Sequence, residues 1–316
     1  MTALTRSRVT AADLLWVAWH RHRWLVVATA VVVAAGVATM LVRSSTVAAV
    51  ADNQLATLYF RTLWRPMYVG LLFGVAIAVF WGAPLLSREY EARTNLVAWG
   101  QDVTATRWLA GQVALLGGLA ACLAAVVGLS MKVMTEYLRE WSGGHFYEPF
   151  TGWFEVAPHL QVGYVLFGFA LGLAAGALTR RTIPAMVIAL FGFLTVRVVV
   201  LEWVRPYLLP PVHTFEAWNT DYQPQVPDYA MYVASGYADA NGEPVAYRSD
   251  WACDARPGST GQTDCLKANG VAGHFADFQP VERVSLFQWI ETGIFVVLAA
   301  ALLVLAWTWV KRARRV

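Results

Sequence analysis

Six long apolar segments dominate the hydrophobic pattern of the chain, and stretches that carry most of the charged residues separate them. An α-helix needs about 20 mainly apolar residues to cross about 30 Å of hydrocarbon, and each segment is close to that length. The segments are 24–42, 67–86, 108–131, 160–178, 184–204 and 286–310. The pattern therefore predicts an all-α integral membrane protein with six transmembrane helices.

The residues before the first span predict a helix of their own. Thr10 and Asp13 have the spacing of a capping box, and Trp16 and Trp19 fall on the apolar side of the segment that follows. Residues 1–23 are therefore interpreted as a cytoplasmic amphipathic helix that lies along the headgroup region. An ordinary extension of the first span is the alternative.

Composition excludes a soluble domain. Apolar residues make up 58% of the chain and charged residues only 14%, whereas soluble domains have roughly 25% charged residues. The net charge of +3 does not indicate nucleic-acid binding, because the basic residues lie beside apolar runs rather than in a surface stripe. Membrane lipid is the expected surrounding, and no nucleic-acid partner is expected.

The distribution of charges predicts the orientation of the spans. Segments 1–23, 87–107, 179–183 and 311–316 share one side and hold thirteen basic and four acidic residues. The opposite side holds ten basic and fifteen acidic residues. Because loops rich in Lys and Arg stay in the cytoplasm, both termini are expected there, in a multi-pass protein of the plasma membrane. Residues 24–204 would then hold spans one to five, and residues 286–316 the sixth span and a basic tail.

Residues 205–285 form an acidic, aromatic stretch with no run long enough to cross the membrane. It is expected to be a small extracytoplasmic segment between spans five and six. Cys253 and Cys265 both fall in it, on the side where a disulfide persists. A bridge between them would contribute about 3 kcal/mol to local stability. Two reduced thiols are the alternative.

Two ionisable residues interrupt the apolar spans at similar depths. Arg197 lies about two turns from the outer end of the fifth span, and Glu291 a similar distance into the sixth. A charge without a partner is costly in the membrane, so the two are hypothesised to form an ion pair across the helices. A structural role is weighed against ligand recognition or proton coupling. No P-loop and no hydrolase or metalloprotease motif occurs, so no catalytic, metal or cofactor site is expected.

The inner loop 87–107 is the most informative stretch. It reads SREYEARTNLVAW at 87–99, followed by VTATRW at 103–108, and 95–99 is an apolar group on the cytoplasmic side. An exposed apolar group of this kind indicates a protein partner or the membrane face. A helical hairpin against the bilayer is the alternative.

This loop resembles the first cytoplasmic loop of bacterial ABC-2-type transporter permeases. The segments FQP at 278–280 and FQWIE at 287–291 resemble the entry of that family into its last span, and the six-span layout also fits. The resemblance implies a type V exporter fold in which two permeases, identical or homologous, pair around a central path. It also implies two copies of a separate ABC ATPase that binds ATP and Mg, so the chain itself would not be an enzyme.

The resemblance also nominates functional residues. The inner loop would carry the coupling helix, with seven residues as contacts for the ATPase: Glu89, Glu91, Arg93, Asn95, Leu96, Val97 and Trp99. Spans two and five would line the translocation path, with six candidates: Phe73, Phe80, Trp81, Phe191, Thr195 and Arg197. Aromatic residues at such places are more often explained by packing.

Three functions follow from this reading. The first is ATP-driven export of an amphipathic, peptide, antibiotic or lipid-like compound. The second is a mechanotransmitting or sensory membrane subunit that is coupled to an ATPase without transporting anything. The third is an ion-coupled carrier, which would have few ionisable groups at mid-membrane to work with.

Overall fold

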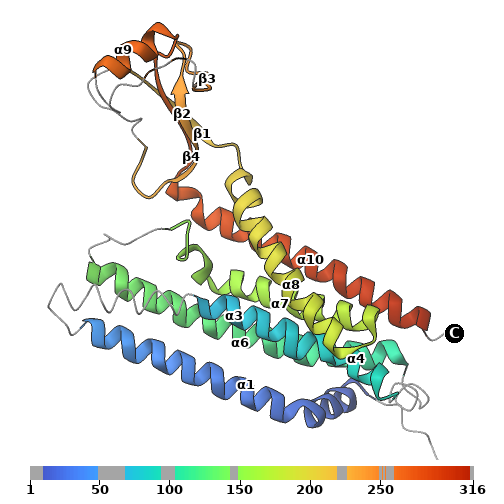
Figure 1. Ribbon diagram of the computed structural model, residues 1–316. Coiled ribbons are helices and arrows are strands. Elements are labelled where there is room, and N and C mark those ends of the chain that lie inside the picture. The colour runs from blue at the N-terminus through green and yellow to red at the C-terminus, as the bar shows by residue number, and fades with distance from the viewer. Residues whose placement is uncertain are drawn as a thin grey trace, which may run out of the picture. The chain divides into compact units, whose positions relative to one another are not determined.

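Helices form most of the structure, a computed structural model that describes residues 10–48, 68–93, 104–142, 149–218, 226–248, 251, 253 and 260–313 (Figure 1). Six of the helical stretches in these ranges are long and apolar enough to cross a membrane. They are Ala11–Val42, Val69–Glu91, Ala105–Tyr137, Pro158–Thr179, Thr182–Tyr207 and Val281–Arg312. Each contains most or all of one predicted span, so the six-span prediction is confirmed.

The chain divides into two compact units. One consists of Met1–Tyr147, Gly152–Val198 and Gln288–Val316, and its described part is helical. The other consists of Glu148–Thr151 and Val199–Phe287 and contains all the strands of the described residues.

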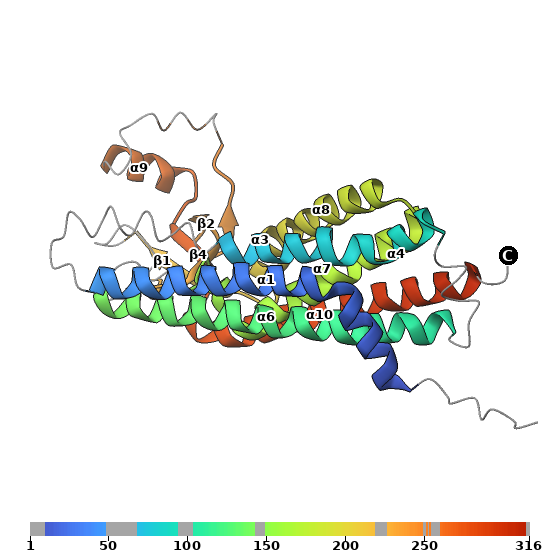
Figure 2. The same cartoon turned by 90° about the horizontal axis from the view of Figure 1, so that it is seen from below.

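The first helix, α1 (Ala11–Ala48), starts at the predicted capping box. The Asp13 carboxylate accepts hydrogen bonds from the Thr10 backbone N–H at 2.8 Å and from its hydroxyl at 2.7 Å, and the Asp13 N–H donates to Thr10 Oγ1 at 3.3 Å. The helix then runs without a break into the first span. Figure 2 shows its first turns bent away from the line of the rest.

The second span has three parts because a proline interrupts its hydrogen-bond ladder. Helix α3 (Tyr68–Ala76) leads into a π-helical turn, η2 (Ile77–Gly82), and then into α4 (Ala83–Glu91). Pro84 has no N–H, and its ring would press on the carbonyl of the preceding turn of a regular helix. The wider turn relieves this crowding, and the Ala83 N–H donates to Ala78 O five residues back.

Helix α7 (Pro158–Thr179) is the most buried of the six spans. It packs against the second span on one side and against α6 (Ala105–Ser142) on another, and α1 packs against α6. The contact with the second span is made by backbone. A Cβ on Gly82 would lie 2.5 Å from Phe169 O, a Cβ on Gly176 would lie 2.6 Å from Ala83 O, and a Cβ on Gly172 would collide with Ala78 O. Small residues at these places allow the helices to approach closely.

The fifth span begins with α8 (Thr182–Val199) and ends in two short turns, η4 (Val200–Val204) and η5 (Arg205–Tyr207). Its buried residues recur every fourth position and so lie on one side of the helix. They are Ala185, Ala189, Phe193 and Arg197. The sixth span belongs to α10 (Val284–Ala313), which follows a 3-10 turn, η7 (Val281–Arg283).

The second unit contains a four-stranded antiparallel sheet with the order β1-β4-β2-β3. Its strands are β1 (Val212–Ala217), β2 (Met231–Ala238), β3 (Pro244–Val245) and β4 (Gly273–Gln279). The expectation of an all-α protein is therefore wrong for this part of the chain. The strands are short and rich in aromatic and small residues, so they escape a search for runs of membrane length.

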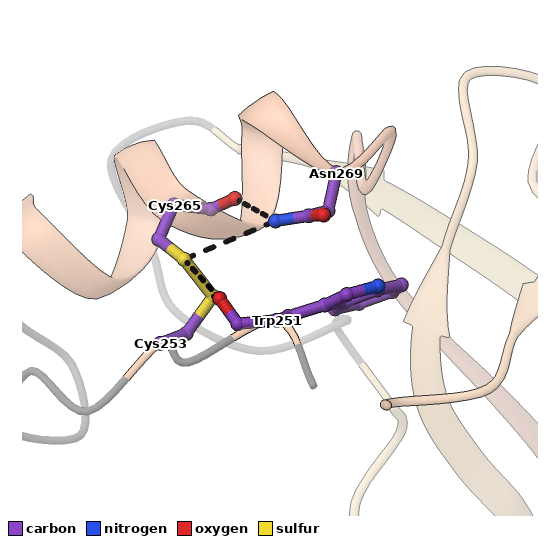
Figure 3. Close-up of a disulfide and its surroundings, with 4 residues drawn as sticks. All are labelled: Trp251, Cys253, Cys265 and Asn269. Carbon is purple, nitrogen blue, oxygen red and sulfur yellow. Dashed lines mark hydrogen bonds between the residues drawn. A yellow bond between two sulfur atoms is a disulfide. The ribbon is translucent and has the colours of Figure 1, made fainter. Parts of the chain in front are cut away.

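One small core beside this sheet includes the predicted disulfide, which the structure contains. Cys253 is bonded to Cys265 of α9 (Thr260–Ala268), and Leu266 and Val271 are buried beside the bond. Figure 3 shows the Asn269 side chain next to Cys265, to whose backbone oxygen it donates a hydrogen bond of 2.9 Å. A unit of this size buries little apolar surface, so a covalent link contributes much of its local stability.

Replacing Gly172 by Ala should destabilise the helical unit, because the new Cβ meets backbone atoms of the second span that cannot move independently. Overpacking of this kind costs about 1–3 kcal/mol. The expected result is a lower thermal denaturation midpoint for the purified protein in a fixed detergent. Gly118→Ala is the matched control, because a Cβ there meets nothing within 4 Å. Equal midpoints for the two variants would contradict the backbone contact.

Candidate functional site

A buried cluster of charged and aromatic side chains surrounds Arg197. Its Nη2 lies 2.6 Å from Glu155 Oε1, and its Nη1 lies 3.3 Å from Glu291 Oε1. The guanidinium carbon is 3.5 Å from the centre of the Tyr164 ring, and the Tyr164 hydroxyl donates to Glu291 Oε1 at 2.6 Å. The structure therefore brings together Arg197 and Glu291, the two residues hypothesised to pair across the helices.

Four separate elements supply this cluster. Arg197 comes from the buried side of α8, Tyr164 from α7 and Glu291 from α10. Glu155 comes from η3 (Phe154–Val156), a 3-10 turn that leads into α7. The sequence did not point to Glu155, because Glu155 falls between the predicted spans 108–131 and 160–178 and so outside the membrane layer. Its position three residues before Pro158, the first residue of a span, was the available signal.

Burial makes the cluster sensitive to the loss of any member. Arg197 is 5% exposed and Glu291 is fully buried, so neither charge is well solvated. Removing one partner of such a group costs about 3–5 kcal/mol, because a charge is then left in the interior. The arrangement has one cation between two carboxylates, and it links three spans and the turn before the fourth. This chemistry positions helices, and it contains no nucleophile next to a base.

A second polar group joins the end of the second span to the start of the fifth. The Glu91 carboxylate accepts hydrogen bonds from the Thr182 backbone N–H at 2.8 Å and from its hydroxyl at 2.6 Å. The Ser87 hydroxyl lies 3.1 Å from the same Thr182 hydroxyl. Glu91 therefore acts on the first turn of α8, where a negative charge stabilises a helix.

The other residues nominated for ATPase contact lie in different settings. Glu89 is 2% exposed and forms an ion pair with Arg21 of α1. Arg93 is exposed and has a positive φ of 52°. The remaining four, Asn95, Leu96, Val97 and Trp99, lie outside the described residues. Glu89 and Glu91 thus hold the end of α4 against two other helices.

The residues nominated for the translocation path separate into buried and exposed groups. Phe73 is 8% exposed and Trp81 3%, and the Trp81 indole N–H donates to Thr29 Oγ1 of α1 at 3.2 Å. Phe80 and Phe191 are 59% and 63% exposed, and Thr195 is exposed on the side of α8 away from its buried residues. Arg197 belongs to the buried cluster.

Six apolar helices held together by buried polar groups define a multi-pass membrane protein. Residues 49–205, about half of the chain, match the family described as ABC-2 membrane transporter related. The chain is therefore an ABC-2-type permease, a membrane component of a transporter, and the resemblance of the inner loop is confirmed at the level of the family. No curated protein and no solved structure matches the chain.

Replacing Arg197 by Gln should reduce stability more than replacing Glu291 by Gln. The first change leaves the buried Glu291 carboxylate and the partly buried Glu155 carboxylate without the cation that they share, whereas the second leaves the contact between Arg197 and Glu155 in place. The expected loss for Arg197→Gln is about 3–5 kcal/mol. The measurement is the thermal midpoint and the yield of monodisperse protein in detergent.

Combining the two changes is the control for this interpretation. Glu291→Gln should partly restore the Arg197→Gln protein, since it removes one of the two carboxylates. The charge-swapped double variant, Arg197→Glu with Glu291→Arg, should likewise be more stable than either of its single changes. Additive losses in both double variants would show that these side chains do not interact.

Proposed function

We propose that the chain is the membrane-spanning subunit of an ATP-driven exporter whose ATPase is a separate polypeptide. The ATPase binds ATP and Mg, and two copies of it work with two permeases, identical or homologous. The proposal rests on the family match over 49–205 and on the inner loop 87–107, whose sequence resembles the coupling loop of such permeases.

The observation that carries the proposal is the attachment of this loop's first end to three helices. Glu89, the last residue but two of α4, pairs with Arg21 of α1, and Glu91 caps α8 through Thr182. A force applied to the loop by a moving ATPase therefore acts on α1, α4 and α8 together. Both side chains contribute to coupling by positioning the loop, and the apolar residues Leu96, Val97 and Trp99 supply the surface that the ATPase covers.

The exposed side of α8 is the part of the path that this chain contributes. Phe191 and Thr195 lie there, opposite the buried residues Ala189 and Phe193. A second permease placed against this side would close a path for an amphipathic, peptide, antibiotic or lipid-like substrate. The basic segments place both termini in the cytoplasm of a bacterial cell. Outward transport, from the cytoplasm or the inner leaflet, is what the resemblance to exporters implies.

One observation favours a second candidate, a mechanotransmitting subunit. Strands β1 to β4 form a sheet with a disulfide-bonded core beside it, which is a folded element beyond what a simple loop between two spans needs. Such an element suits a protein that transmits motion from an ATPase to an extracytoplasmic partner. Purified complexes in vesicles separate the two functions, because only an exporter moves a compound across the bilayer.

Co-expression with an ATPase encoded beside this chain should give a stable complex that hydrolyses ATP. Leu96→Asp should reduce recovery of the ATPase with the tagged permease at least tenfold, since it places a charge in an apolar contact. Glu140→Gln is the control, because Glu140 is exposed near the opposite end of the third span. Recovery of the ATPase at the control level with Leu96→Asp would place the contact elsewhere, and failure to bind any ATPase would refute the proposal.

The disulfide offers a test of the orientation of the chain in the membrane. In intact cells of a Cys122→Ser variant, a membrane-impermeant maleimide should label Cys253 and Cys265 only after treatment with a reductant, because the bond consumes both thiols. The readout is the mass of the labelled protein. Labelling that needs permeabilised cells would place residues 205–285 in the cytoplasm and both termini outside the cell.

A further inference from the structure

A cavity of about 150 Å³ lies between α1 and the second span, at the end where α4 leads into the inner loop. Its volume equals that of an engineered cavity that accepts benzene, so it has room for a small polar group. Nine residues line it: Arg21, His22, Leu25, Phe80, Trp81, Pro84, Leu85, Arg88 and Glu89. The lining combines the charged side chains of Arg21, Arg88 and Glu89 with apolar side chains such as Phe80 and Leu85.

The charges of this lining leave one cation in excess. Arg21 and Glu89 neutralise each other in an ion pair. Arg88 is exposed and forms no ion pair with any residue that the structure describes. A guanidinium in this situation binds an anionic oxygen group such as a phosphate, because its fork of N–H donors fits two oxygens at once.

The apolar side of the cavity indicates a ligand with a hydrocarbon part. Phe80 is 59% exposed beside the cavity, and Leu85 and Trp81 are buried within its lining. On α1, Trp24 is 73% exposed and the Arg23 guanidinium lies 5.4 Å from its ring centre. Tryptophan and arginine together are typical of the boundary between hydrocarbon and headgroups. A soluble anion would leave this apolar surface uncovered.

We propose that the cavity binds the phosphate headgroup of an anionic phospholipid of the inner leaflet, with Arg88 as the direct contact. The acyl chains lie along Phe80 and the outer surface of α1. Since Glu89 lines the same cavity and belongs to the first turn of the inner loop 87–107, a bound lipid acts on the ion pair between Arg21 and Glu89 and with it on the position of the loop. This is a site for a resident lipid, distinct from the path proposed for the exported substrate.

The test uses the full chain alone, purified in a neutral detergent and mixed with equal amounts of phosphatidylglycerol and phosphatidylcholine of the same chain length. Native mass spectrometry counts the lipids that stay bound. The wild-type protein should retain phosphatidylglycerol preferentially, and Arg88→Gln should lower that preference about fivefold, the effect of one arginine at an anionic surface. Arg88→Lys should keep only part of it, because the charge remains while the second oxygen contact of the guanidinium is lost.

Arg312→Gln is the matched control, because Arg312 is an exposed basic residue in the last turn of α10 and lies outside the cavity. Equal losses for Arg88→Gln and Arg312→Gln would mean unspecific attraction and would overturn the site.

Displacement of the lipid by millimolar glycerol phosphate would overturn the lipid assignment in favour of a soluble phosphate. A photoactivatable phosphatidylglycerol should label peptides from residues 80–89, and labelling elsewhere alone would also overturn the proposal. Because no ATPase is present, these results do not depend on the outcome for the proposed exporter.

Discussion

The close approach of α7 to the second span is the constraint on which the helical unit depends. In lipid there is no hydrophobic gain from bringing two apolar helices together, so association depends on packing and on polar contacts. Gly82, Gly172 and Gly176 let backbone meet backbone, and the π-helical turn before Pro84 shapes the second span at the same level. A regular helix with larger residues at these places could not bring its carbonyls against the partner, and α7 would lose its central position.

Polar groups attach the surrounding helices, α1, α8 and α10, to α7 and the second span. They do so near both ends of the spans. Arg197 reaches Glu155, Tyr164 and Glu291, and so connects α8 and α10 to α7. Toward the other end, Glu91 binds the first turn of α8 and Arg21 of α1 pairs with Glu89. Leaving Arg197, Glu291 or Glu89 without a partner is expensive, because these three side chains are buried, and this makes their contacts specific even though each adds little net stability.

The sequence predicted the features that are determined by the local hydrophobic pattern and by the free-energy cost of burying a charge in the membrane. Six runs of membrane length gave the spans, and two charges at equal depth suggested that Arg197 and Glu291 would meet, because burial leaves such charges few other solutions. It did not predict Glu155 or Tyr164 as partners, since the fold of the turn before α7 decides which side chain enters the membrane layer. It also missed the sheet, whose order β1-β4-β2-β3 pairs strands far apart in the chain. Pairings of that kind depend on tertiary contacts rather than on a local period.

The two attachments of α8 bear on how the proposed exporter would work. Thr182 and Arg197 lie fifteen residues apart, which is about 22 Å along the helix, and side-chain contacts hold α8 at both positions. Between them the buried side of α8 presents the small Ala185 and Ala189 nearer to Thr182, and the fully buried Phe193 nearer to Arg197. A displacement of Glu91 would therefore move the inner end of α8 while the Arg197 cluster keeps the outer part in place. The motion is then a tilt about Arg197, and it changes the exposed side that carries Phe191 most at its inner end, where a substrate from the cytoplasm or the inner leaflet would enter.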